Sequence, residues 1–409
     1  MGLILGTAVF AYFVTIVERS SMGVASLAAT QRFDIGATAL STLAVAQLAI
    51  YAAMQIPAGL ILDRLGARKL IIFGSLLTGV GNLLVATTPT FSLAIVGRMI
   101  VGFGDSFIFI SMIRLINGWV QGPRATRYTQ LFANIGQLGQ IASAVPFAYL
   151  LGVAGWSPAF AAISALALIA AICSTLFLKD EPRNEELPLK SLRLVTQFRE
   201  NLRDPFTRKA FWVHFTMQSS GSVFILLWGY PFMVQGEGIA KATASLLLSS
   251  FVIIGFLVGP LLSHVCVAYP ERRNRLVTVM YALILAAWLL VLLTPGQNPL
   301  WQIILLVLII GSGGPASMVA FDYSRTSIPK HRLGSSNGVI NSGGFVATFV
   351  CMFLIGAVLD IVKANQLVAS AELYSLDAFK LAMPVQLVVL SIGLAMFYRE
   401  RRKTQTLAE

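Results

Sequence analysis

The feature that most constrains this chain is a series of apolar runs, each long enough to cross a bilayer. A membrane-spanning helix needs about 20 mostly apolar residues, and twelve stretches approach or exceed that length. Only 12% of the residues are charged, against about 25% in an ordinary globular chain, so lipid must be the solvent. The sequence therefore predicts an all-α membrane protein with twelve transmembrane helices. The predicted spans are residues 3–30, 37–62, 70–88, 91–119, 126–151, 157–178, 210–235, 242–267, 276–293, 300–327, 334–360 and 378–398.

The charge distribution predicts how these spans are oriented. A formal net charge of +12 could indicate a nucleic-acid partner. The basic residues instead gather in alternate gaps, and retention of positive loops in the cytoplasm explains this bias without nucleic acid. Both termini are therefore expected to be cytoplasmic. The inner gaps hold Arg64, Arg68, Lys69, Arg124, Arg127, residues 179–209, Arg272, Arg273, Arg275, Lys330, Arg332 and residues 399–403, whereas the outer gaps hold Arg32, Lys241, Lys363 and Lys380.

The longest polar stretch, residues 179–209, divides the spans into six plus six. We expect an N-terminal six-helix bundle over residues 1–178, a cytoplasmic linker over 179–209, and a C-terminal six-helix bundle with a short basic tail over 210–409. The linker is too short for a catalytic or signalling domain. No basic region precedes the first apolar run, so we expect a retained helix rather than a signal peptide.

Residues that carry metal or enzyme chemistry are scarce. Cys173, Cys266 and Cys351 each lie alone in an apolar run and are expected to be small buried hydrophobes. His214 and His264 lie near inner helix ends, where we expect both at the membrane interface. The sequence contains no nucleophile–base pair, ATP motif or Gly-rich phosphate loop. It therefore predicts a protein that is not an enzyme and holds no cofactor or metal.

A motif between the second and third runs recurs in degraded form in the second half. The first copy, residues 59–69, reads GLILDRLGARK and contains Asp63 and Arg64. The second begins at residue 259 and reads GPLLSH, with Ser263 in place of Asp63. The first copy resembles the signature of the major facilitator superfamily, and the resemblance covers essentially the whole chain. It implies a transporter built from two parallel six-helix halves.

Two further stretches bear on the branch of that superfamily. Residues 98–104, RMIVGFG, resemble its second motif. Residues 136–140, GQLGQ, depart from the Gly-Pro-x-x-Gly-Gly run that drug/proton antiporters carry in the fifth span. This departure argues against a drug efflux pump.

Four ionisable residues lie well inside two predicted spans: Glu18 and Arg19 in the first, Arg98 and Asp105 in the fourth. Each costs about 2.5–3.5 kcal/mol at a helix centre, so such residues are functional candidates. Arg98 and Asp105 are seven residues apart and therefore share a helix face. Because four unpaired charges would cost on the order of 10 kcal/mol, we expect these groups to meet one another or a water-filled cavity.

An acid–arginine pair in the first span with Arg98 and Asp105 in the fourth resembles the anion:cation symporter branch, which includes sugar-acid, sialic-acid and glutamate carriers. The resemblance implies that Arg19 binds the substrate carboxylate. Glu18 and Asp105 would then be the proton-responsive acids, with Arg98 as their partner. The branch usually has Glu at the second acid, so Asp105 is a shorter variant. The alternative is a fixed ion-pair network that pins the first span to the fourth.

Gating candidates lie near the predicted cytoplasmic ends of the spans. Asp63, with Arg64 and Arg68 beside it, is expected to face the start of the eleventh span, residues 334–337. Free N–H groups and the positive end of the helix dipole favour a carboxylate there. That contact would hold the two halves together in one conformation.

Other polar residues divide into inner-end charges and cavity candidates. Arg114, Asp322 and Arg325 are expected to snorkel or to form gate-closing salt bridges rather than to contact substrate. Uncharged polar side chains more often make helix-packing hydrogen bonds than ligand contacts, but several could line a cavity. These candidates are Gln47, Tyr51, Gln55, Gln137, Gln140, Gln218 and Asn341.

The sequence therefore predicts proton-coupled symport of a small organic anion, a carboxylate or sugar acid, by alternating access. An acid paired with Arg19 must be protonated before Arg19 can bind the anion, so proton and substrate move together. The alternatives are an uncoupled facilitator of zwitterions, such as short peptides or amino acids, and drug or metabolite efflux. We expect a monomer in a bacterial cytoplasmic membrane, with lipid, protons and an anionic or zwitterionic small molecule as its partners. Substrate identity, coupling ion and direction stay open.

Overall fold

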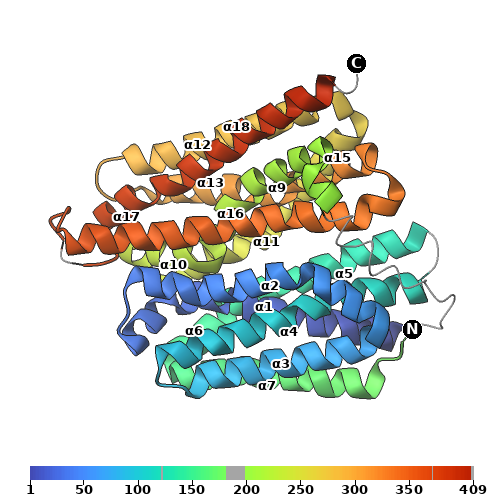
Figure 1. The fold of residues 1–409 in the computed structure, drawn as a ribbon. Helices are drawn as coiled ribbons and strands as arrows, with labels where there is room; N and C mark the ends of the chain where they lie inside the picture. Colours follow the sequence, from blue (N-terminus) through green and yellow to red (C-terminus); the bar gives the residue numbers. More distant parts are fainter. Residues whose placement is uncertain (121–122, 181–198, 371, 407–409) are drawn as a thin grey trace. The chain divides into compact units, whose positions relative to one another are not determined.

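The computed structural model describes residues 1–120, 123–180, 199–370 and 372–406, and the secondary structure there is helical (Figure 1). The chain forms two compact units. The first comprises Met1–Ile35 and Thr42–Leu189, and the second comprises Gly36–Ser41 and Lys190–Glu409. The start of the second helix therefore belongs with the second unit. Most of the predicted linker lies outside the described residues.

The helices of the first unit follow the predicted spans closely. The fourth helix has the predicted bounds, and the fifth predicted span is one helical segment with a π-helical turn at Pro146. The elements are α1 (Gly2–Phe33), α2 (Ala37–Leu65), α3 (Ala67–Thr87), α4 (Phe91–Trp119), α5 (Pro123–Ala142), η1 (Ser143–Phe147), α6 (Ala148–Ala154) and α7 (Trp156–Phe177).

The second unit contains more interrupted helices. Its elements are α9 (Pro205–Val223), η2 (Phe224–Trp228), α10 (Gly229–Pro231), η3 (Phe232–Gly236), α11 (Lys241–Ala268), η4 (Pro270–Arg272), α12 (Arg273–Leu293), α13 (Leu300–Gly311), α14 (Gly313–Ser317), α15 (Val319–Ser327), α16 (Lys330–Ala364), α17 (Leu376–Ala382) and α18 (Pro384–Thr406). Within this unit α16 and α18 pack against α9, and α13 packs against α11 and α12.

Eleven helical segments within the described residues are long and apolar enough to cross a membrane. The predicted span at 210–235 is helical but is not among them. Gln218 and the serines beside it make α9 more polar than its neighbours. The count of twelve and the orientation of the termini therefore stay predictions.

In the first unit, large apolar side chains are exposed and charged side chains are buried, which is the reverse of a water-soluble protein. Val80 is 53% exposed and Leu176 is 67% exposed, whereas Glu18, Arg98 and Asp105 are at most 1% exposed. Apolar side chains on the outside suit a hydrocarbon solvent, and charges inside must be satisfied within the protein. This burial pattern is that of an integral membrane protein.

Glycines bring α3 and α4 into direct contact. A Cβ atom on Gly81 would lie 2.7 Å from the Gly97 carbonyl oxygen, and one on Gly74 would lie 2.6 Å from the Gly104 oxygen. Only small residues permit such an approach between membrane helices. This contact brings Asn82, next to Gly81, into the interior beside α1 and α4.

Candidate functional site

Arg19 on α1 and Asp105 on α4 form a two-pronged ion pair inside the first unit. Arg19 Nε donates to Asp105 Oδ2 at 2.9 Å, and Arg19 Nη2 donates to Oδ1 at 2.7 Å. The Asp105 side chain is 1% exposed and that of Arg19 is 14% exposed. The planar guanidinium fork matches a carboxylate in this geometry. The predicted meeting of charges between the first and fourth spans is present for this pair.

Aromatic and amide side chains surround the Arg19 guanidinium. Its central carbon lies 4.3 Å from the centroid of the Tyr51 ring on α2, a cation–π contact. Gln137 on α5 donates from Nε2 to the Tyr12 hydroxyl at 3.1 Å, and Gln140 donates to Gln137. Tyr51 and Gln137 were predicted site residues, and Tyr12 was not. Tyr12 precedes Arg19 by two helical turns and so shares its face, which is the signal that could have identified it.

Gln47 on α2 is a buried amide beside the Asp105 carboxyl. It is 1% exposed, and neither its nitrogen nor its oxygen has a hydrogen-bond partner. It lies one turn before Tyr51, and its main-chain oxygen would be 2.3 Å from a Cβ on Gly102 of α4. An unsatisfied buried amide is costly, and the Asp105 carboxyl is the polar group beside it.

Glu18 forms a second, fully buried cluster with Asn82 of α3 and Arg98 of α4. Asn82 Nδ2 donates to Glu18 Oε1 at 2.8 Å. Arg98 Nη1 approaches the main-chain oxygen of Glu18 at 3.5 Å, and among the described residues no ion pair joins the two side chains. Glu18 Oε2, Asn82 Oδ1 and Arg98 Nε have no hydrogen-bond partner. Asn82 was missing from the predicted site, because one amide in an apolar span indicates only helix packing.

The predicted gating residues make contacts within their own units. Arg68 Nη2 donates to the Thr175 carbonyl at 2.8 Å, and its main-chain nitrogen donates to Asp180 Oδ1 at 2.9 Å. Asp180 thus caps the start of α3. Arg64 is exposed, Arg114 is half-buried, and the Asp63 side chain lies outside the described parts.

On α15 of the second unit, Arg325 Nη1 lies 3.5 Å from Asp322 Oδ1, one turn away. At the start of α16, Ser335 accepts from Asn201 Nδ2 at 2.7 Å, and Ser336 and Thr207 share a hydrogen bond of 3.0 Å. These residues tie the first turn of α16 to the start of α9 and the segment before it. The gating roles of Asp322, Arg325 and residues 334–337 stay predictions.

Uncharged polar residues of the second unit surround the interruption between α14 and α15. Ser317 donates to Gln218 Oε1 at 3.1 Å, and Gln218 Nε2 donates to Ser222 at 3.1 Å. The expectation that His214 lies at the interface is wrong: it is 3% exposed and packs edge-on against Phe321. Asn341 is half-buried on α16, and His264 is exposed.

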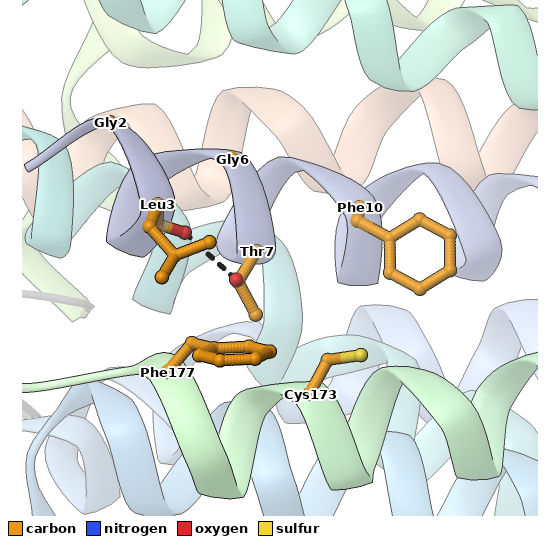
Figure 2. Close-up of a pocket in the computed structure, with 7 residues that line it drawn as sticks. All are labelled: Gly2, Leu3, Gly6, Thr7, Phe10, Cys173 and Phe177. Carbon is orange, nitrogen blue, oxygen red and sulfur yellow. Dashed lines mark hydrogen bonds between the residues drawn. The ribbon is translucent and has the colours of Figure 1, made fainter.

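An apolar groove at the start of α1 is separate from these clusters. It encloses about 320 Å³ between α1 and α7 (Figure 2). No charged side chain lines it, and its one polar group, the Thr7 hydroxyl, donates to the Leu3 carbonyl at 2.8 Å. Its chemistry suits lipid rather than an ionic ligand. The lining residues are Gly2, Leu3, Gly6, Thr7, Phe10, Cys173 and Phe177.

Two curated proteins show how this chain compares with known sequences. The chain is 29% identical over 185 residues to a Cupriavidus necator protein named "Probable sulfoacetate transporter". The aligned region covers 44% of this chain and 42% of that protein. The chain thus matches less than half the length of that relative. It is 22% identical over 388 residues to an Escherichia coli K12 protein named "Probable galactarate/D-glucarate transporter", which covers 84% of each chain.

Solved structures resemble the fold over almost the full length. A bacterial homologue of the human lysosomal transporter Spinster, inward-facing and unoccupied, has a TM-score of 0.77 at 15% identity, covering 98% of this chain and 96% of that one. The nucleoside transporter NupG has a TM-score of 0.72 at 13% identity, covering 98% and 99%. The family model described as Major Facilitator Superfamily matches residues 8–352. The chain is therefore an integral, multi-pass membrane protein that belongs to the Major Facilitator Superfamily.

Proposed function

We propose that this protein is a secondary transporter that moves a small organic anion, a carboxylate or a sugar acid, together with protons. The observation that carries the proposal is the Arg19–Asp105 pair. Arg19 is a cation inside a membrane helix, held on the face of Tyr51 and bound by both oxygens of a carboxylate. A substrate carboxylate would use the same two donors, so Asp105 occupies the position that the substrate would take.

The names of relatives support an anionic substrate. Sulfoacetate, galactarate and D-glucarate, which appear in the names of two similar proteins, all carry acidic groups that ionise at neutral pH. A guanidinium fork suits carboxylate and other oxyanions. The sugar acids also carry hydroxyl groups, which the buried amide of Gln47 and the Tyr12–Gln137 pair could bind.

The strength of a buried ion pair favours coupling to protons. Breaking such a pair by removing one partner costs about 3–5 kcal/mol, because the other charge is left uncompensated. A substrate that displaced Asp105 from Arg19 would leave that carboxylate charged beside a second anion. Protonation of Asp105 removes the charge before the substrate arrives. Proton and anion would therefore bind together, whereas an uncoupled carrier of zwitterions would not need the proton.

The direct test uses purified protein. Thermal-shift screening against carboxylates, sugar acids, peptides and nucleosides should identify stabilising ligands, since a ligand at 100 times its Kd adds about 2.7 kcal/mol to stability. Proteoliposomes should then accumulate that anion when the outside is made acidic. If the ligand exchanges rapidly but never accumulates under a proton gradient, the uncoupled facilitator replaces the symporter.

Asp63→Asn should impair turnover more than binding. The predicted contact of Asp63 with residues 334–337 belongs to one conformation of the cycle, so its loss shifts a conformational equilibrium rather than a binding contact. We expect substrate affinity within about threefold of wild type and an exchange rate at least about tenfold lower. Lys69→Gln is the neighbouring control, because Lys69 is exposed and is not one of the gating candidates. Collapsed affinity with a normal exchange rate would contradict the gating role.

A further inference from the structure

Within the described parts of the chain, the side-chain amide of Asn82 donates a hydrogen bond to the Glu18 carboxyl group. Its Oε1 accepts from Asn82 Nδ2 at 2.8 Å, and the same nitrogen donates to the Thr78 carbonyl at 3.0 Å. The Thr78 hydroxyl, which lies beside this carboxyl, donates its hydrogen to the Ser75 carbonyl at 3.1 Å. While it bonds the Ser75 carbonyl, that hydroxyl can accept from a protonated Glu18, and by rotating it can instead donate to the charged form.

The charged groups near Glu18 do not supply a further donor. Arg98 and Asp105, both on α4, act on this carboxyl electrostatically. The Arg98 guanidinium bonds the Glu18 main-chain oxygen, and Asp105 is occupied by Arg19. The helix α3 contributes only uncharged groups, α7 carries no charged residue, and the charged residues of α5 lie in its first turns.

The unsatisfied atoms of this cluster indicate a neutral carboxyl group in the present state. Glu18 Oε2 and Asn82 Oδ1 are both buried without a partner, and both are acceptors. A proton on Oε2 turns it into a donor, with Asn82 Oδ1 and the Thr78 hydroxyl as candidate acceptors. The ionised form has the Asn82 N–H group in place of the water that it has lost.

We propose that Asn82 is the positioning residue that allows Glu18 to release its proton. When the O–H bond breaks, the electron pair stays on the carboxylate and the proton passes to water. Asn82 Nδ2 already donates to Oε1 and so stabilises the charged form as it appears. Without it, the buried carboxyl would keep its proton. This inference rests on the proposed proton coupling and adds to it a residue that binds neither substrate nor proton.

An infrared titration tests the proposal without any substrate. The carbonyl stretch of protonated Glu18 is isolated by subtracting the spectrum of Glu18→Gln from that of the full-length protein across a pH series. We expect Asn82→Leu to move the midpoint of this band upward by about one pH unit or more, a tenfold rise in proton affinity. Thr87→Val is the control on the same helix, because the exposed Thr87 hydroxyl bonds the Leu83 carbonyl rather than Glu18, and it should leave the midpoint in place. An unchanged midpoint in the Leu variant overturns the proposal.

Transport assays distinguish a role of Asn82 in proton release from a role in holding the helices together, because a structural defect would reduce exchange as well as accumulation. Asn82→Leu should reduce pH-driven accumulation at least about tenfold and keep counterflow exchange. In a Glu18→Gln background the same substitution should have no further effect; additive losses overturn the proposal. If wild type shows no pH-driven accumulation, proton symport itself is refuted, and the infrared titration still decides the role of Asn82. If Asn82→Leu does not fold, Asn82→Ala, which also lacks the N–H group, carries both tests.

Discussion

Arg19→Ala should abolish binding of the anionic substrate. The substitution removes both donors of the guanidinium fork, and hydrogen bonds to charged groups are worth about 1.5–3 kcal/mol each. Their joint loss corresponds to a fall in affinity of at least about a hundredfold. Calorimetric titration of the purified variant with the anion found by screening measures this directly. Affinity equal to that of wild type would show that Arg19 is structural.

The control must separate lost binding from lost folding. Arg19→Ala leaves Asp105 buried without its cation, so the variant is expected to be less stable by about 3–5 kcal/mol. The double variant Arg19→Ala with Asp105→Asn removes that uncompensated charge and should recover stability without recovering binding. Arg19→Lys keeps the charge but loses the fork, so its affinity should fall between those of wild type and Arg19→Ala.

Asp105→Asn should uncouple transport from protons. The amide resembles the protonated acid and no longer ties up Arg19, so the anion can bind without a proton. We expect retained binding, retained counterflow and a loss of at least about tenfold in accumulation under an inward proton gradient. Counterflow and pH-driven uptake should be measured on the same proteoliposomes, so that a loss of accumulation can be compared with the exchange activity of the same preparation.

The second acid provides the comparison for Asp105→Asn. Glu18 has no contact with the Arg19 guanidinium in the described structure, so Glu18→Gln should not weaken the Arg19–Asp105 pair. If the Asn variant at 105 still concentrates substrate at low external pH, coupling does not pass through Asp105. Glu18 is then the acid that carries it.

Much of the fold could be predicted from the chain because bilayer thickness sets the length of an apolar run. The helix α4 has the predicted bounds, and the match of the family model confirms the resemblance seen in residues 59–69. The cost of unpaired charges in lipid predicted that charges of the first and fourth spans would meet, but not that Arg19 rather than Arg98 would pair with Asp105. These inferences needed only hydropathy and charge along the sequence.

The parts of the candidate site that could not be predicted depend on contacts between segments that are distant in the sequence. Asn82 and Glu18 are 64 positions apart, and glycine contacts between α3 and α4 place the amide at the carboxyl. A single sequence contains no signal for that proximity. The expectation for His214 failed for a related reason, since its distance from a helix end does not tell how deeply other helices cover it.

The polarity of a sequence segment is also a poor guide to membrane spans where neighbouring helices cover the polar side chains. The helix α9 carries Gln218, Ser219 and Ser220, and the two serines are 1% exposed. Ser220 donates to Gln386 at 3.0 Å and accepts from Trp288 Nε1 at 2.9 Å. Because bonds to other helices satisfy the Ser220 hydroxyl, a polar side chain can be buried in this segment although the segment does not reach the hydropathy of a lipid-facing span.

The four charged groups of the candidate site, Glu18, Arg19, Arg98 and Asp105, all lie on α1 and α4 of the first unit. The polar groups described around Gln218 in the second unit are amides and hydroxyls. The charged groups thus depend on the packing of two helices within one unit. A substitution that separates α1 from α4 would therefore disturb both acids and both arginines at once, even where it changes none of the four side chains.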